Sequence, residues 1–211
     1  MRLCFIGGGN PLNKELDDVM YYLSNSIEIG NNILIIPFAT ENSKVDKWFT
    51  SLKKSFKDIG MEHIKLLDYQ LTNQEMQKEI KQHSILYFTG GRPEKLMRIL
   101  AEKELIQEIK EFSGLIVGVS AGALVFSEDC IITKDQYYLE TQVIEGLGLV
   151  DFSVEVHYNG NNDKELLSLS ATRDIYAIPN GIAIFWEDNV VKPIHNVTLF
   201  RKRKKQIVTE D

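Results

Sequence analysis

Short apolar runs alternate with helix-periodic segments along the first two-thirds of the chain. Most of these runs are aliphatic or aromatic, and they predict β-strands over residues 2–6, 33–36, 63–67, 84–88 and 115–119. Between them, apolar side chains recur at spacings of three and four residues, which predicts helices. Strands that are apolar on both sides are typical of a parallel sheet covered by helices on both faces. This region therefore predicts an α/β fold.

Local signals place the starts of several helices. Asn10-Pro11 forms a helix entry, with asparagine as the cap and proline at the first helical position, and apolar residues follow at helical spacing over 12–27. Thr72 and Glu75 have the spacing of a capping box, which opens a short helix that runs through Ile80. Further helices are expected over 45–56 and, as one broken or two short helices, over 96–109.

The last third of the chain changes to closely spaced strand patterns, at 152–158, 174–178, 182–186, 190–194 and 197–201. Asn180-Gly181 and Asp188-Asn189 supply turns, so we expect an antiparallel extension of the sheet. The basic run 201–205 is interpreted as a solvated edge strand, where lysines discourage strand pairing between molecules. Without an internal repeat or a linker, residues 1–211 are expected to form a single domain.

Composition and charge narrow the function classes. The chain has 211 residues, 44% of them hydrophobic and 26% charged, which is typical of globular proteins. Its net charge of −6 is a poor match for nucleic-acid binding. There is no apolar run long enough to cross a bilayer and no signal-peptide core, and we expect a cytoplasmic protein. Cys4 and Cys130 lie in apolar runs and are expected to be buried and reduced, and no residues have metal-ligand spacing.

Three predicted strands end in glycine-rich turns, at 7–9, 90–91 and 118–122. Because the carboxyl ends of parallel strands lie at one edge of a sheet, these turns are expected to converge. The first turn does not complete a dinucleotide-binding pattern, since Leu12 stands where its third glycine would fall.

The turn Gly118-Val119-Ser120-Ala121-Gly122 has the pattern of a nucleophile elbow. In such an elbow, a tight turn between a strand and a helix projects the serine hydroxyl, and its neighbours must be small. Ser120 is therefore the candidate nucleophile. The other interpretation is that Gly118 and Gly122 only permit close packing, with Ser120 as a helix cap.

A serine nucleophile needs a base, and His157 is the candidate because it ends a predicted strand downstream of the elbow. The other histidines lie in polar helix flanks or a late hairpin (His63, His83, His195). Asp135 is the leading candidate for the acid that orients the imidazole. Three further acids are alternatives, and each acid is also readily explained as a surface charge (Glu128, Asp129, Glu140).

Backbone amides are the candidate oxyanion donors, from Ala121 beside the serine and from the Gly90-Gly91 turn. A plain strand-to-helix turn, with Pro93 opening the helix, is the other interpretation of that glycine pair.

Four segments together resemble the S51 family of serine peptidases, which includes dipeptidase E and cyanophycinase: Gly-Val-Ser-Ala-Gly-Ala at 118–123, Tyr-Phe-Thr-Gly-Gly at 87–91, Val-His-Tyr-Asn at 156–159, and 177–184. The resemblance covers most of the chain. It implies a class I glutamine-amidotransferase-like fold, with serine in place of the amidotransferase cysteine. It also implies Ser120 as nucleophile, His157 as base, Asp135 as third member, and the Gly91 and Ala121 amides as oxyanion hole.

Two departures from the family pattern affect substrate recognition. Arg92-Pro93-Glu94 follows the glycine pair, where the family usually has asparagine and a small hydroxyl residue. The segment 159–164 lacks the arginine with which dipeptidase E holds a substrate aspartate. Specificity for an N-terminal aspartate is therefore not expected from this segment. The candidate substrate-binding residues are Gly90, Arg92 and Asn159, although a solvent-facing side chain is the other interpretation of Arg92.

The leading hypothesis is a serine exopeptidase that hydrolyses short peptides, dipeptides in particular, through an acyl-enzyme. This mechanism needs no metal or organic cofactor, and its partner is a short peptide substrate. One alternative is an esterase of the α/β-hydrolase type, in which the order Ser–Asp–His also occurs. The other is a non-catalytic amidotransferase-like module that binds a ligand, because one fold hosts many functions.

Overall fold

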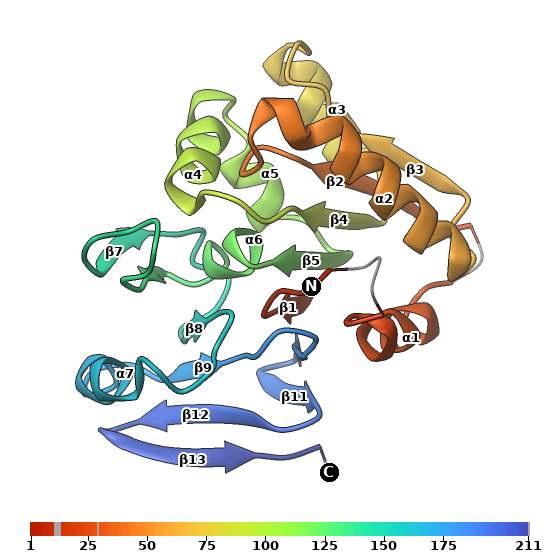
Figure 1. The fold of residues 1–211 in the computed structure, drawn as a ribbon. Coiled ribbons are helices and arrows are strands. Elements are labelled where there is room, and N and C mark those ends of the chain that lie inside the picture. The colour runs from red at the N-terminus through yellow and green to blue at the C-terminus, as the bar shows by residue number, and fades with distance from the viewer. Residues whose placement is uncertain (11–13, 29, 211) are drawn as a thin grey trace.

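The computed structural model describes residues 1–10, 14–28 and 30–210. Its centre is a seven-stranded sheet in the order β11-β10-β1-β5-β4-β2-β3 (Figure 1). Five of its strands run parallel, as predicted: β1 (Arg2–Ile6), β2 (Asn32–Ile36), β3 (His63–Leu66), β4 (Ile85–Phe88) and β5 (Leu115–Val119). Because β5 lies between β1 and β4, the three glycine-rich turns follow three adjacent strands.

Two strands from the last third extend this sheet in the antiparallel sense, as expected. β10 (Ala183–Glu187) pairs with β1, and β11 (Val190–Ile194) pairs with β10. Asp188 and Asn189 connect them with φ of 51° and 63°. Positive φ at both central residues is what a tight hairpin turn requires.

The remaining strands of this region form a second sheet in the order β13-β12-β9-β8. Its strands are β8 (Ser153–Glu155), β9 (Ile175–Ala177), β12 (Val197–Arg201) and β13 (Lys204–Val208). β8 and β9 are parallel, and the other pairs are antiparallel. β13 is the exposed edge, which places the basic run 201–205 on an edge hairpin as interpreted from the sequence. A separate hairpin is formed by β6 (Asp129–Ile132) and β7 (Gln142–Glu145).

Helices cover both faces of the central sheet. On one face, α1 (Asp17–Asn25) and α2 (Val45–Asp58) pack against Cys4 and Ile6 of β1. The opposite face, through Leu3 and Phe5, packs against α3 (Asn73–Gln82), α4 (Pro93–Glu102), α5 (Ile106–Lys110) and α6 (Ala121–Leu124). Alternate residues of one strand thus enter two different cores, which explains why the parallel strands are apolar on both sides.

The predicted helix starts agree with the structure to different degrees. Thr72 and Glu75 form the predicted capping box at the start of α3. α1 begins at Asp17, well after the predicted entry at Asn10, and Pro11 and Leu12 lie outside the described residues. A short 3₁₀ turn (Asn42–Lys44) precedes α2. The sequence patterns did not predict α7 (Asp163–Leu169), which follows the asparagine-rich segment 159–162.

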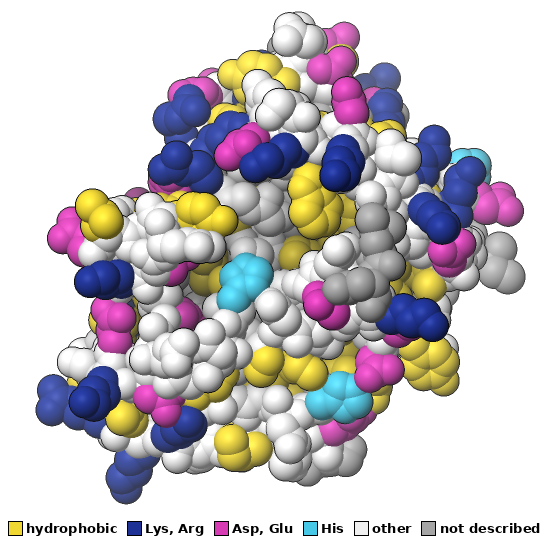
Figure 2. Space-filling model, viewed as in Figure 1, with side chains coloured by type: hydrophobic (Ala, Val, Ile, Leu, Met, Phe, Trp, Pro, Cys, Tyr) yellow, Lys and Arg dark blue, Asp and Glu magenta, His cyan; other side chains and the backbone are white. Residues whose placement is uncertain are grey.

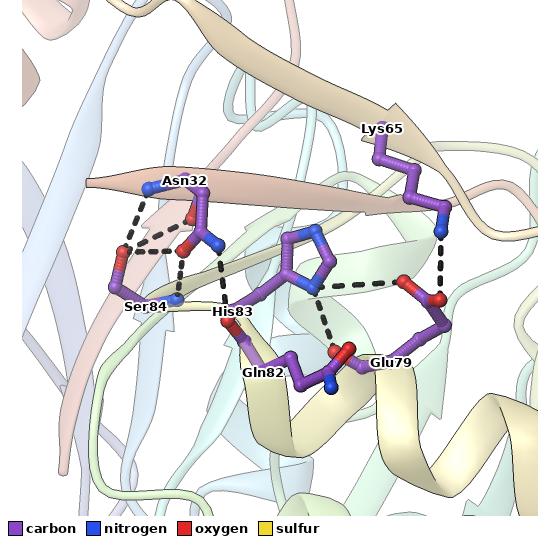
Figure 3. A network of polar contacts seen from close by, with 6 residues as sticks. All are labelled: Asn32, Lys65, Glu79, Gln82, His83 and Ser84. Atoms are coloured by element: carbon purple, nitrogen blue, oxygen red, sulfur yellow. Dashed lines mark hydrogen bonds and ion pairs between the residues drawn. The ribbon is translucent and has the colours of Figure 1, made fainter. Parts of the chain in front are cut away.

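A polar network ties the amino-terminal ends of β2 and β4 together, at the edge of the sheet opposite the glycine-rich turns (Figure 3). The Ser84 hydroxyl accepts a hydrogen bond from the backbone N–H of Asn32 at 2.9 Å. In return, Oδ1 of the Asn32 side chain accepts from the backbone N–H of Ser84 at 2.8 Å. His83 Nδ1 lies 2.7 Å from the carbonyl oxygen of Glu79 in α3. This histidine therefore has a structural role.

The helices and the two cysteines can be compared with what the sequence predicts for the apolar segments. No helix in the described ranges combines the length and apolar character that crossing a bilayer requires. Cys4 and Cys130 are buried free thiols, and burial raises the pKa of both, that of Cys130 to about 12.

Candidate active site

Ser120 occupies the tight turn between β5 and α6. Its φ of 51° and ψ of −115° are strained for a residue with a side chain. A Cβ at Gly118 would lie 2.5 Å from the Gly122 carbonyl carbon, and one at Gly122 would lie 2.4 Å from the Phe88 carbonyl oxygen. Glycine at both positions therefore allows α6 to approach β5 and β4, as an elbow requires.

The hydroxyl of Ser120 faces a histidine. Ser120 Oγ lies 2.8 Å from His157 Nε2, and the serine side chain makes no capping hydrogen bond to α6. Ser120 thus stands at the N-cap position of α6, but its hydroxyl faces His157 and does not cap the helix. The contact is of the length at which a serine proton can pass to an imidazole nitrogen.

Three consecutive backbone carbonyl groups at the end of β1 bind the segments that carry Ser120, His157 and Gly181. The Ile6 oxygen accepts from the Ser120 N–H at 3.0 Å, and the Gly7 oxygen accepts from the His157 N–H at 2.8 Å. The next oxygen, that of Gly8, accepts from the Gly181 N–H at 2.9 Å. His157 departs from the strand conformation, with φ of 53°, which ends the predicted strand 152–158 early and turns the ring toward Ser120.

The second ring nitrogen of His157 meets an amide side chain. His157 Nδ1 lies 2.6 Å from Asn180 Oδ1, and Asn180 precedes Gly181 in the turn that leads into β10. Because an amide oxygen only accepts, Nδ1 carries the proton of the neutral ring and Nε2 is left as the acceptor for the serine hydroxyl. The sequence patterns had identified Asn180 only as a turn residue.

Asp135, the leading sequence candidate for this position, is not brought to His157. Its Oδ1 accepts instead from the backbone N–H groups of Tyr137 and Tyr138, at 2.7 and 2.8 Å. This Asx-type turn shapes the loop between β6 and β7. The alternatives Glu128, Asp129 and Glu140 line neither of the two cavities beside Ser120, and Asp129 pairs with Arg173 at 2.8 Å.

The glycine pair after β4 lies beside the elbow and is fixed by the loop after β2. The Thr40 hydroxyl donates to the Gly90 oxygen at 2.9 Å, and the Arg92 amide donates to the Ala39 oxygen at 3.0 Å. Gly91 has φ of 142°, and a Cβ there would lie 2.1 Å from that same Ala39 oxygen. In the described chain the Gly91 N–H has no backbone acceptor, and that of Ala121 begins α6 and has none within the helix.

Two cavities meet at Ser120 and His157. One has a volume of about 670 Å³ and extends over the β6–β7 loop and the asparagine-rich segment 159–162. The other, of about 450 Å³, extends toward Leu16, Trp48 and Tyr87. Gly91 lines both. Figure 2 shows this face hollowed near its middle, where a histidine lies among uncharged side chains and most charged groups lie farther out.

The candidate substrate-binding residues are divided between these cavities. Arg92 lines the smaller one together with Gly90, but its side chain is exposed and its Nε lies 2.6 Å from Glu94 Oε1. Asn159 lines the larger cavity, where its Oδ1 accepts from the backbone N–H of Asn161 at 3.0 Å.

Glu155 is a site residue that sequence reasoning missed. It is 4% exposed and lines the larger cavity, and its Oε1 accepts from Thr133 Oγ1 at 2.9 Å and Asn162 Nδ2 at 3.0 Å. Burial raises its pKa to about 7, against the two hydrogen bonds, which lower it. The signal was available, because Glu155 and His157 alternate with Val154 and Val156.

The sequence comparisons match this chain to a peptidase family and to two named peptidases. The model of peptidase family S51 matches residues 3–194. A protein named Peptidase E from Nostoc sp. is 27% identical over 223 residues, covering 94% of this chain and 88% of that protein. An uncharacterized peptidase of Listeria monocytogenes is 29% identical over 171 residues, covering 74% of this chain and 82% of the relative.

Solved structures of peptidases share the fold. That of a peptidase from an acI-B1 actinobacterium superposes with a TM-score of 0.77 at 23% identity, over 99% of this chain and 94% of the other. A putative peptidase E from L. monocytogenes gives a TM-score of 0.72 at 24% identity, over 91% of this chain and 96% of the other.

Proposed function

This chain belongs to peptidase family S51 and is a serine-type peptidase, and we propose that it is an exopeptidase that hydrolyses short peptides, dipeptides in particular. The observation that carries the proposal is the 2.8 Å contact between Ser120 Oγ and His157 Nε2 at the junction of two cavities. Both cavities have the size of small-ligand pockets, which suits a substrate of a few residues with its scissile bond at Ser120.

In the first half of the reaction, Ser120 Oγ attacks the scissile carbonyl carbon and its proton passes to His157 Nε2. The N–H groups of Gly91 and Ala121 donate to the oxygen that becomes negatively charged. The proton on Nε2 then passes to the leaving nitrogen, the C–N bond breaks, and an ester on Ser120 remains.

In the second half, His157 takes a proton from water as the water oxygen attacks the ester carbonyl. The proton returns to Ser120 Oγ when the ester bond breaks, which releases the acid product. Asn180 holds His157 in the tautomer that both halves need. In this proposal Asn180 takes the place next to the imidazole for which the sequence favoured Asp135.

Three features support treating residues 1–211 as one functional unit. Ser120 follows the central sheet, His157 follows a strand of the second sheet, and one core cluster includes buried residues of both sheets.

Hydrolysis of a dipeptide library by the purified protein, beside Ser120→Ala, tests the proposal. We expect cleavage that the variant loses by about 10⁴-fold or more, together with labelling of Ser120 by a fluorophosphonate. An ester panel is assayed in parallel. Ester cleavage without peptide cleavage would favour an esterase, and peptide cleavage that survives in Ser120→Ala would refute the assigned nucleophile.

A further inference from the structure

Glu155 is a buried carboxylate that the proposed mechanism does not use. Both of its hydrogen bonds, from Thr133 and Asn162, are made to Oε1. Oε2 has no hydrogen-bond partner in the described part of the chain, and the residue lines the larger cavity. Burying a carboxylate costs free energy unless both of its oxygens are hydrogen-bonded or ion-paired. The unpaired Oε2 of this buried side chain therefore suggests a ligand that would pair with it.

The charges around Glu155 do not supply a partner. The described residues give it no ion pair, and the charged groups that act on its pKa are two acids, Glu165 of α7 and Asp135 of the β6–β7 loop. Both raise that pKa further. Asp135 lines the same cavity, and the basic side chain there, Lys134, forms no ion pair with Glu155. This part of the cavity therefore favours a positive charge from outside the chain.

The position of Glu155 relates this preference to the reaction. Glu155 ends β8 two residues before His157, so about 7 Å of chain separates the two. Both side chains line the cavity that also contains Ser120. Because one cavity is lined by Glu155 and Ser120, a peptide whose scissile carbonyl lies at Ser120 can place a neighbouring residue toward Glu155.

We infer that Glu155 forms a subsite for a positively charged group of the peptide substrate, an ammonium or guanidinium that binds its free Oε2. The charge is either the free α-amino group or the side chain of a lysine or arginine. This inference rests on the proposed function, and it adds a charge preference to it. The hydrogen bonds of Thr133 and Asn162 hold the carboxylate in place, and Gln at position 155 can keep both.

Matched substrate pairs test the subsite. One pair compares a lysine with norleucine in the residue before the scissile bond, and the other compares a free with an acetylated amino terminus. We expect kcat/KM at pH 7.5 to favour the charged member of one pair by about 10-fold or more. The Glu155→Gln variant should lower that ratio toward 1. The control Glu145→Gln, an exposed acid on β7 outside both cavities, should keep the wild-type ratio.

Two further measurements keep the test independent of turnover and of a folding defect. Calorimetric binding of the same peptides to Ser120→Ala, with and without Glu155→Gln, reports the subsite without hydrolysis. In the unmodified chain, the lysine-to-norleucine ratio is followed from pH 5.5 to 8.5, where the lysine ammonium stays charged. If that pair responds, its ratio should rise through about pH 7 as Glu155 ionises.

The outcomes separate this inference from the proposed function. Equal kcat/KM and equal binding within both pairs, or a preference that Glu155→Gln leaves unchanged, would overturn the subsite while Ser120-dependent hydrolysis stands. Glu155-dependent binding of a charged peptide without any Ser120-dependent hydrolysis would support the subsite and refute the exopeptidase.

Discussion

Gly8 lies directly against His157. A Cβ at position 8 would lie 2.3 Å from His157 Cε1 and 2.5 Å from Asn180 Oδ1. The ring and its amide partner therefore occupy the space that any side chain at this position would fill. The Gly8 carbonyl also accepts from the Gly181 N–H, so Gly8 contacts the His157 ring and also fixes the turn that carries Asn180.

The Gly8→Ala variant should fold and lose activity. The added methyl group displaces the imidazole from Ser120, and a displacement of about 1 Å costs about 100-fold in kcat/KM. Steady-state kinetics on the best dipeptide and the rate of fluorophosphonate labelling measure the loss.

Gly60→Ala is the matched control for that experiment. Gly60 also has positive φ, at 90°, but a Cβ there meets nothing within 4 Å. It should lower the free energy of unfolding by about 1–2 kcal/mol, because an L side chain is strained at positive φ, and leave kcat/KM unchanged. Equal losses of activity in the two variants would show that backbone strain, rather than contact with His157, is responsible.

Asn180→Ala should lower kcat/KM by about 10- to 100-fold, because the acceptor that fixes the imidazole tautomer is lost. Asn180→Asp should retain more activity, with the acidic limb of its rate–pH profile moved to higher pH. The limb moves in this direction because a carboxylate beside the ring stabilises the protonated imidazole, which cannot act as a base. Rate–pH profiles of both variants measure this, and the exposed Asn196→Ala is the control. An unchanged profile in Asn180→Asp would contradict the assigned contact.

Gly91→Ala should lower kcat by about 10²- to 10³-fold with little change in KM. The Cβ would collide with the Ala39 oxygen, so the Gly91 N–H moves away from its proposed oxyanion position, and an oxyanion donor acts mainly in the transition state. Gly148→Ala, also at positive φ but with its nearest atom 4.0 Å away, controls for strain. A rise in KM alone would indicate that this amide binds substrate instead.

Stability should depend on pH through Glu155. Its pKa is about 7 in the folded chain, raised mainly by burial and further by Glu165 and Asp135, against a reference value of 4.5. The folded state therefore binds more protons between these values, and the stabilisation present below pH 4.5 is lost as pH rises through about 7.

Urea unfolding of the wild type and of Glu155→Gln, at several pH values from 4.5 to 8, measures this effect. Because Gln does not titrate, the stability of the variant relative to wild type should rise by about 3 kcal/mol over that range. A difference that stays constant with pH would show that the carboxylate ionises normally.

Much of the scaffold could be predicted because its signals are local. The residues of β1 and β5 match the predicted strands 2–6 and 115–119, since each is a mostly apolar run, with Gly7 directly after the first and Gly114 directly before the second. The capping box of α3 needs only the side chains of Thr72 and Glu75, which lie within one helical turn.

The site partners depend on contacts between distant segments, which spacing does not specify. Asn180 meets His157 across 23 residues because Gly7 and Gly8 each accept a hydrogen bond from one of the two segments. Asp135 has the expected chemistry, but its carboxylate is used by its own loop. The second sheet escaped prediction for a similar reason, because the parallel pairing of β8 with β9 spans α7.

The three carbonyl groups at the end of β1 also set when activity can first appear on a growing polypeptide. β1 leaves the ribosome before β5 and β10, the strands that flank it in the sheet. The three carbonyl oxygens at its end accept hydrogen bonds from Ser120, His157 and Gly181, which are synthesised much later. A nascent chain that ends before the turn at 180–181 lacks Asn180 and the last of these hydrogen bonds. With the proposed roles of Ser120, His157 and Asn180, we therefore expect peptidase activity to appear only after the last of these distant segments pairs with the end of β1.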